Sequence, residues 1–250
     1  MKRLMGGLMA LMLGGIAFGA EFDDLVAKGD EYDVTFKSDE ALKYYLPAEK
    51  LNPNDASLLI KIARQYVFRM DGLGSKAEKV ESGRVALSYS ERAVKLAPDM
   101  ANSYLSVAVC WGKLTPLLGS KEKVEASRVI KQSAEKATKL DPSNDYAWHM
   151  LGRWHLALSD VGGMVRGIAT LVYGGIPDAS LEEAERCFKK AIALNPNRLI
   201  HYVELGRTYA QMGRKAEAIS NLEKGLAMPN QEKDDGETKV RGRDALAKLK

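Results

Sequence analysis

The sequence has few residues of the kinds that mark several common protein classes. Only 2 of its 250 residues are cysteine, which excludes a small domain held together by many disulfides. Only 8 are proline and no low-complexity tract occurs, so most of the chain is expected to be ordered. The formal net charge is +4, which is too balanced for a nucleic-acid partner, because such a partner requires a strong basic excess.

The first twenty residues differ from the rest of the chain. Lys2-Arg3 precedes an uncharged apolar run, Leu4 to Phe18, and Ala17-Phe18-Gly19 places small residues where a signal peptidase reads. The pattern predicts a signal peptide over residues 1–19 and export, to a bacterial periplasm or the extracellular space. The run is short for a membrane span and charged residues follow from Glu21, although an uncleaved membrane anchor is the alternative.

Internal repetition is the strongest signal in the remaining chain. Two segments carry the same spacing of large and small residues: Trp148-x2-Leu151-Gly152-x2-His155 with Ala184-x3-Phe188, and Tyr202-x2-Leu205-Gly206-x2-Tyr209 with Ala218-x3-Leu222. This is the tetratricopeptide pattern, in which small residues let two helices approach and large ones fill the space between units. It predicts an all-α, tetratricopeptide-like right-handed solenoid.

Recurring unit ends define the repeats. Leu51-Asn52-Pro53, Leu140-Asp141-Pro142 and Leu194-Asn195-Pro196 share one form, and Ala93-x4-Pro98 is related to it. We therefore expect one repeat domain over residues 20–250, made of about five helix pairs and a capping helix. The units lie near 22–55, 56–100, 101–144, 145–198 and 199–232, and the cap lies at 234–249. Extra residues separate the two helices of units two, three and four.

From about residue 56 to 249 the sequence resembles a narrower family. Leu118-Gly119-Ser120-Lys121-Glu122-Lys123-Val124, Leu151-Gly152-Arg153-Trp154 with a long apolar insertion, and Leu205-Gly206-Arg207-Thr208-Tyr209 are similar to the regulator of microtubule dynamics family. The resemblance implies association with microtubules and organelle membranes. An exported bacterial protein meets no microtubules, so the resemblance implies the fold and binding mode rather than the partner.

Catalytic patterns are missing from the sequence. His149 and His155 are six residues apart on one expected helix, so they do not share a face as zinc ligands at i and i+4 would. No phosphate-binding loop or nucleophile motif occurs. We therefore expect neither an enzyme nor a cofactor or metal. Cys110 and Cys187 are expected to be free thiols in the core, with a disulfide as the alternative.

Equivalent positions on the first helix of each unit are expected to line a concave groove. The fifth position of units two to five holds Ile60, Leu105, His149 and Val203. The ninth position holds Arg64, Val109, Arg153 and Arg207. One row is mostly apolar and the other carries three Arg, a combination that suits a ligand with an apolar body and an anionic group. The alternative is that these Arg pair with neighbouring Glu or coat the surface.

The insertion of unit four is the most unusual segment. Its apolar residues recur at helical spacing, which predicts a helix with one apolar face: Val161, Met164, Val165, Ile168, Leu171 and Val172. Such a helix could cover the groove as a lid, lie on a membrane surface or bury its own stripe. Trp111 and Trp148 occupy packing positions of the repeat, whereas Trp154 is not explained by the pattern.

Two classes of function follow from these patterns. The first is a scaffold that holds a protein or peptide partner in the groove. The second is a carrier or membrane tether for an apolar, anionic ligand such as a lipid. Neither class involves nucleic acid.

The leader generates the first test. We expect N-terminal sequencing of the exported protein to start at Ala20, because Ala17 and Gly19 satisfy the small-residue positions of a cleavage site. A mature chain that still begins at Met1 would rule out cleavage and leave the membrane anchor.

Overall fold

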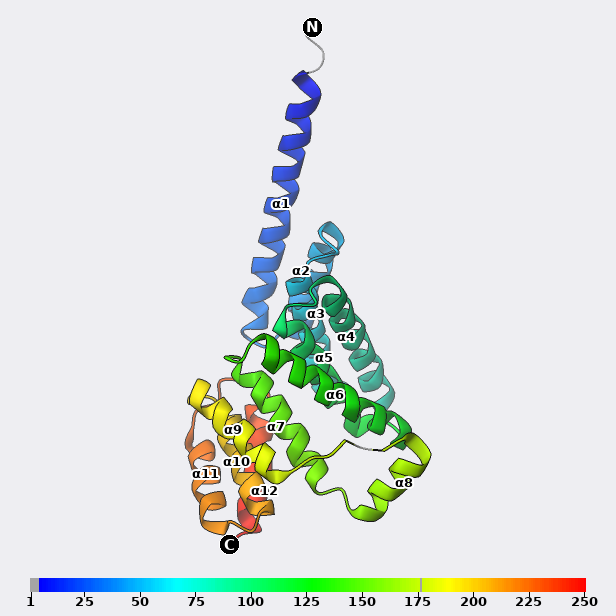
Figure 1. The fold of residues 1–250 in the computed structure, drawn as a ribbon. Helices are drawn as coiled ribbons and strands as arrows, with labels where there is room; N and C mark the ends of the chain where they lie inside the picture. Colours follow the sequence, from blue (N-terminus) through cyan, green and yellow to red (C-terminus); the bar gives the residue numbers. More distant parts are fainter. Residues whose placement is uncertain (1–4, 176) are drawn as a thin grey trace. The chain divides into compact units, whose positions relative to one another are not determined.

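The computed structural model describes the backbone of residues 5–175 and 177–250, and the side chains from residue 19 onward except those of residues 164–166, 168, 173 and 176. Within this part the chain forms twelve α-helices and two short 3-10 helices and contains no strand, which confirms the all-α prediction. The helices form two compact units, Met1–Pro98 and Asp99–Lys250. Figure 1 shows the order of the helices within each unit.

The first unit contains two helix pairs. α1 (Met5–Asp33) packs on α2 (Ser38–Leu51), and α3 (Ala56–Arg69) packs on α4 (Lys76–Leu96). Side-chain caps fix the N-termini of both helices in the second pair. The Asp55 carboxylate caps α3, and Ser75 forms a capping box with Glu78 at α4. The 3-10 turn Met70–Gly72 follows α3.

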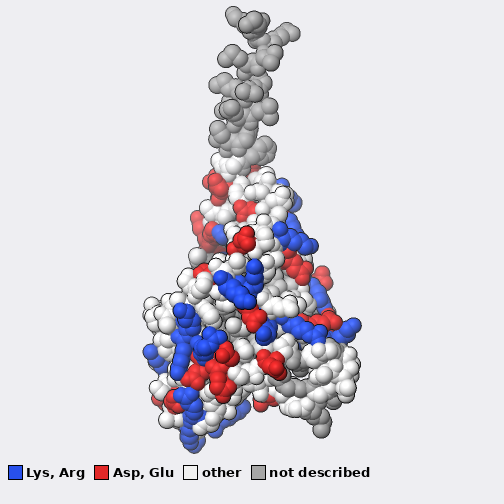
Figure 2. Space-filling view, viewed as in Figure 1, with Lys and Arg blue, Asp and Glu red and all other residues white. Residues whose placement is uncertain are grey.

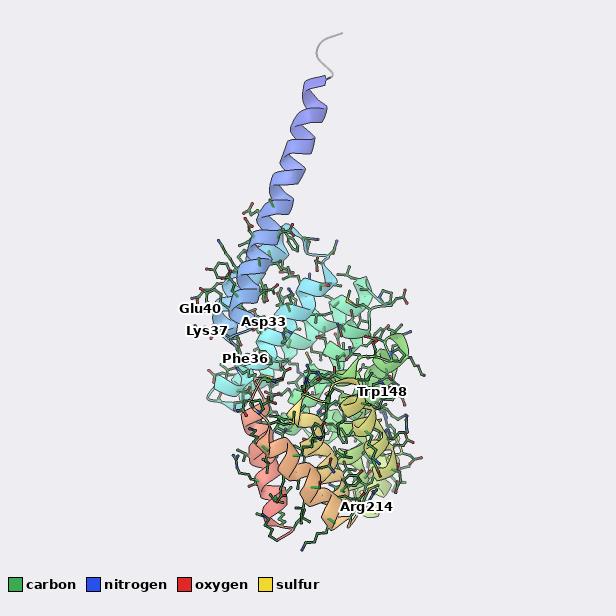
Figure 3. All side chains as sticks on the ribbon, turned by 90° about the vertical axis from the view of Figure 1, so that its left-hand side faces the viewer. Asp33, Phe36, Lys37, Glu40, Trp148 and Arg214 are labelled. Carbon is green, nitrogen blue, oxygen red and sulfur yellow. The ribbon has the colours of Figure 1, made fainter. Side chains whose placement is uncertain are left out.

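A polar network ties the first three helices together. The Tyr45 hydroxyl donates to Asp30 at 2.6 Å and contacts Asp33 at 3.3 Å, while Lys61 donates to Asp30 at 2.6 Å. The turn after α1 is built on Phe36, which has a left-handed φ of 58° and packs edge-on against Phe68. Figure 3 shows Asp33 and Phe36 together at this turn. A non-glycine residue tolerates this backbone only when its surroundings hold it.

The second unit contains three helix pairs, one extra helix and a cap. The pairs are α5 (Ala101–Leu114) with α6 (Ser120–Leu140), α7 (Asp145–Ser159) with α9 (Leu181–Leu194), and α10 (Leu199–Gln211) with α11 (Lys215–Ala227). The cap, α12 (Asp235–Ala247), packs on both α10 and α11. Five pairs and a capping helix across the two units confirm the predicted repeat number.

The extra residues take two different forms. In the second and third repeats the extra residues lengthen the second helix, since α4 and α6 have 21 residues each. The 3-10 turn Thr115–Leu117 precedes α6. In the fourth repeat the extra residues form a separate helix, α8 (Gly163–Tyr173), which contacts α6. α8 therefore stays outside the pair formed by α7 and α9.

Glycines allow close approach between paired helices, as Gly152 and Gly206 show. A Cβ atom added to Gly152 of α7 would lie 2.9 Å from the ring of Phe188 on α9, and Phe188 is fully buried. A Cβ atom added to Gly206 of α10 would lie 2.7 Å from Leu222 and 2.9 Å from its backbone nitrogen. The pair α7 and α9 and the pair α10 and α11 thus touch at distances that only glycine allows.

Two buried histidines join α7 to α10. Nδ1 of His149 lies 3.0 Å from Nδ1 of His201, and Nε2 of His201 lies 2.9 Å from the Asp145 carboxylate. Because Asp145 accepts a hydrogen bond from Nε2 of His201, Nδ1 of His201 must accept from His149. Burial lowers the pKa of His149 well below the ordinary 6.5, and burial also lowers that of His201 although Asp145 opposes the shift.

Overpacking tests the helix contacts. We expect Gly152→Val and Gly206→Ala each to lower the free energy of unfolding by about 1–3 kcal/mol, measured as urea midpoints, because the new side chain overlaps Phe188 or Leu222. Gly236→Ala is the matched control: nothing lies within 4 Å of its Cβ position, so it should be neutral or slightly stabilising. Parental midpoints for both test variants would show that the repeat register is wrong.

The buried histidines predict a dependence on pH. Their pKa values are lowered in the folded state, so below about pH 6.5 the unfolded chain binds more protons and stability falls as the pH decreases. Urea midpoints at about pH 7.5 and about pH 5.5 measure this loss above the range where carboxylates titrate. His149→Phe keeps a ring but cannot titrate, so the difference between the two midpoints should shrink. An unchanged difference would contradict the role of this pair.

Candidate functional site

The candidate groove residues fall in both compact units. Ile60 and Arg64 belong to the first unit, where Ile60 is half-buried and Arg64 forms an ion pair with Asp33. Leu105, His149, Arg153, Val203 and Arg207 belong to the second. A single Arg row that spans both units stays a prediction.

Two candidates in the second unit are buried and a third is already paired. His149 and Val203 have no exposed surface, and Val203 lies against the Gly242 position of α12. The Arg207 guanidinium, which is partly exposed, donates to Glu204 at 2.6 Å, and Arg241 of α12 lies 3.6 Å from the same carboxylate. The role of these three side chains in binding stays a prediction.

Arg153 has different surroundings. It lines a cavity of about 660 Å³ in the second unit. The walls come from the end of α5, the 3-10 turn Thr115–Leu117, α6, α7 and the insertion. Most lining surface is apolar and includes Val124, Ile130, Met150 and Trp154. Cavities of this size and character are typical of small-molecule sites.

Two cations, Arg153 and Lys123, lie on the cavity. Neither forms a salt bridge or hydrogen bond with any residue in the described part of the chain, whereas most Arg side chains of the second unit are paired. Arg153 is half-buried and Lys123 is exposed. An anion placed between them would therefore gain charge-assisted hydrogen bonds without breaking an existing pair.

Charge is mixed on the face drawn in Figure 2. There, acidic and basic side chains lie side by side over the region of α9 and α11. Among them, Arg214 contacts Glu185 at 2.8 Å and Lys189 contacts Glu185 at 2.6 Å. On this face the two signs of charge therefore largely offset each other.

The insertion supplies part of the cavity wall. Val161 and Ala169 line the cavity, and Ala169 is buried. Leu171 and Val172 point outward, with 89% and 61% of their surface exposed. The side chains of Met164, Val165 and Ile168 lie outside the described residues. α8 therefore has one side on the cavity and another in solvent.

Two hydrogen bonds secure the segment that follows α8. Arg128 of α6 donates to the Gly175 carbonyl at 2.7 Å, and the Ser180 amide donates to Nδ1 of His155 at 3.3 Å. Burial lowers the pKa of His155, and this keeps its ring nitrogen available as an acceptor. The insertion is thus attached at its C-terminal end to both α6 and α7.

The tryptophans and cysteines have mainly structural surroundings. Trp154 is buried and donates to the Ser127 carbonyl at 2.8 Å while its ring forms cavity wall. Trp148, labelled in Figure 3, donates to the Pro142 carbonyl and lies under Arg186. Cys110 and Cys187 are buried thiols that form no disulfide, as expected, and burial raises the pKa of Cys187 to about 12.

Sequence reasoning missed the contribution of α6 to the cavity. Ser120, Lys123 and Val124 line it, and all three lie in the Leu118–Val124 run that carries the family resemblance. That run was the available signal. Repeat position alone could not place it beside Arg153, because α6 meets α7 through the packing of neighbouring units.

Metal-binding clusters and membrane-spanning helices are both missing from the described residues. No group of three or more His, Cys, Asp or Glu among them could hold a metal ion. None of the helices they form is long and apolar enough to cross a membrane.

Solved structures support the fold. The chain aligns with a thermophilic TPR protein of Thermus thermophilus with a TM-score of 0.66 and 20% identity, covering 90% of this chain and 99% of the other. It aligns with PilF of Pseudomonas aeruginosa with a TM-score of 0.59 and 14% identity, covering 93% of this chain and 90% of the other. At these identities the likeness shows the helical repeat solenoid alone, as predicted.

Sequence relatives identify the family. Regulator of microtubule dynamics protein 1 of Mus musculus is 26% identical over 234 residues, which span 92% of this chain and 75% of the mouse protein. Protein 2 of Macaca fascicularis is 26% identical over 195 residues, but the match spans only 47% of its length. The family model for regulator of microtubule dynamics proteins 1-3 matches residues 20–250. The chain therefore belongs to the regulator of microtubule dynamics protein 1-3 family.

Proposed function

We propose that the chain is a non-enzymatic binding module, and that it takes a ligand with an apolar body and an anionic group into the cavity of its second unit. The observation that carries this proposal is the position of Arg153 and Lys123, two cations without ion-pair partners in the described part of the chain, on an otherwise apolar cavity of about 660 Å³. A fatty acid or a phospholipid has this chemistry.

The cavity walls favour burial of an apolar chain. Each methylene group transferred from water to such a wall contributes roughly 0.8 kcal/mol, so a chain of several carbons gains affinity without polar contacts. The Arg153 guanidinium presents a planar fork that matches a carboxylate or a phosphate. Ala169 of α8 covers part of the cavity, so the insertion acts as a wall or lid over the apolar part of the ligand.

A protein or peptide partner is the second candidate. The tetratricopeptide fold is typical of proteins that bind other proteins, and the second unit places α5, α7 and α10 in succession as first helices of its repeats. The relatives' names refer to microtubule dynamics. For this chain a microtubule partner is implied only by that name, whereas the cavity and its cations belong to the chain itself.

We also propose that the protein is exported. The support is the leader-like pattern of residues 1–19. Gly19 is exposed and lies within α1, so cleavage there would leave residues 20–33 of that helix to pack against α2. An uncleaved segment would instead tether the same repeats to a membrane.

Fluorescence titration with dansyl-undecanoic acid tests the cavity. We expect the parent protein to bind it and Arg153→Gln to weaken binding about ten- to a hundredfold, because a charge-assisted bond contributes roughly 1.5–3 kcal/mol. The corresponding alcohol has no charge, so it should bind both proteins alike. Deletion of residues 162–174 should weaken the acid and the alcohol together.

Arg243→Gln is the matched control for that titration. Arg243 is exposed on α12 of the same unit and does not line the cavity, so its loss should not change the affinity. Equal affinity of the acid for the parent and Arg153→Gln would remove Arg153 from the site. Failure of the parent to bind either probe, with specific capture of a peptide instead, would favour the second candidate.

A further inference from the structure

The connector between α11 and α12, residues 228–234, lies where three first helices of the second unit meet. The Asp234 carboxylate is 3.0 Å from the Lys113 ammonium in the last turn of α5. The Glu232 carboxylate is 3.0 Å from the guanidinium of Arg198, which is the N-cap residue of α10. The ring of Tyr146, in the first turn of α7, has its centre 5.3 Å from the same guanidinium. The side formed by α5, α7 and α10 thus already holds an acidic segment, supplied by the chain itself.

Of the two cations that pair with the connector, Arg198 is also oriented by groups outside the connector. The Arg198 guanidinium also donates to the Asp145 carboxylate at 2.9 Å, and it lies 5.3 Å from the centre of the Tyr146 ring. Asp145 is in turn bonded to the buried His201. Arg198 is therefore held in place whether or not Glu232 is present, and a guanidinium oriented in advance loses little freedom when it accepts a new carboxylate.

The two carboxylates of the connector are weakly held, although hydrogen bonds fix its backbone next to α12. Residues 229–232 are exposed and outside any helix. Lys113 and Asp234 are each about one quarter exposed, and Glu232 is 47% exposed, so solvent screens both ion pairs and each contributes little to stability. The following Asp235 is buried and accepts from the amides of Gln231 and Glu232, which fixes the start of α12. Glu232 and Asp234 could therefore leave their cations without unfolding the cap.

We propose that Lys113 and Arg198 form a binding site for an acidic segment of a partner protein, and that residues 228–234 occupy this site in the free chain. The partner segment would place two carboxylates two residues apart, as Glu232 and Asp234 do in the turn that leads into α12. This site goes beyond the proposed function, because it uses neither Arg153 nor Lys123 and lies outside the cavity lining.

Competition between the connector and a free peptide tests the site. A fluorescein-labelled peptide of residues 228–236 should bind the parent weakly, because the connector competes at a high effective concentration. The Glu232→Gln/Asp234→Asn double variant keeps the length of the connector but removes its charges. It should bind the peptide about tenfold more tightly or better in fluorescence anisotropy. A peptide with Gln and Asn at those two positions should bind neither protein.

Two further variants distinguish binding at this site from non-specific attraction of the acidic peptide to surface cations. On the double-variant background, Lys113→Gln should weaken peptide binding about fivefold or more, whereas Lys189→Gln removes a cation that pairs with Glu185 elsewhere in the unit and should have no effect. Should the double variant fail to fold, Asp234→Asn alone carries the same comparison. Dansyl-undecanoic acid should bind the double variant as it binds the parent, so this site and the cavity are judged separately.

The contrary outcomes are equally specific. Equal peptide affinity for the parent and the double variant, or equal binding of the charged and neutral peptides, would overturn the proposal. A parent dimer that dissociates when peptide is added would also overturn it, because the occupant would then be the connector of a second copy of this chain.

Discussion

The close contact between the two helices of each repeat is the constraint on which the rest of the second unit depends. α7 packs on α9 although α8 and its connections separate them in sequence, because Gly152 lets Phe188 reach the backbone of α7. A third helix cannot enter a contact of that distance. α8 is therefore displaced toward α6, and the space among α6, α7 and α8 is left as a cavity. The same contact that stabilises the repeat thus leaves room for the cavity in which we propose binding.

The cations of the second unit differ in whether a carboxylate of the chain pairs with them. Arg207 and Arg198, two partly buried cations of this unit, are matched by the carboxylates of Glu204 and Asp145. Arg153 borders apolar wall and has no carboxylate partner among the described residues. A half-buried cation in such a place loses hydration without recovering it from the protein, and the proposed anionic ligand would supply the missing partner.

The sequence predicted the repeats more fully than it predicted the site. Glycine and alanine spacing is a local property, so the helix pairs and the cap could be read from positions such as Gly152, Gly206 and Ala218. The groove rows assumed that every first helix faces open solvent. That assumption does not describe Val203, because α12 lies against it, or His149, because His201 pairs with it. Arg153 was found by its repeat position, but Lys123 was not, since tertiary packing alone brings α6 to it.

Discrimination among ligands must come from the shape of the cavity rather than from its charge. A guanidinium donates hydrogen bonds to a carboxylate or a phosphate with similar geometry. The ammonium of the exposed Lys123 adds electrostatic attraction that depends little on the orientation of the anion. The apolar walls, in contrast, have a fixed volume. Met150 and Trp154 also belong to the buried core, so the inner boundary of the cavity cannot expand without disturbing the repeat. The α8 side is less constrained, because Leu171 and Val172 are exposed there. Changes in α8 can therefore alter which apolar bodies fit while the repeats and Arg153 stay in place.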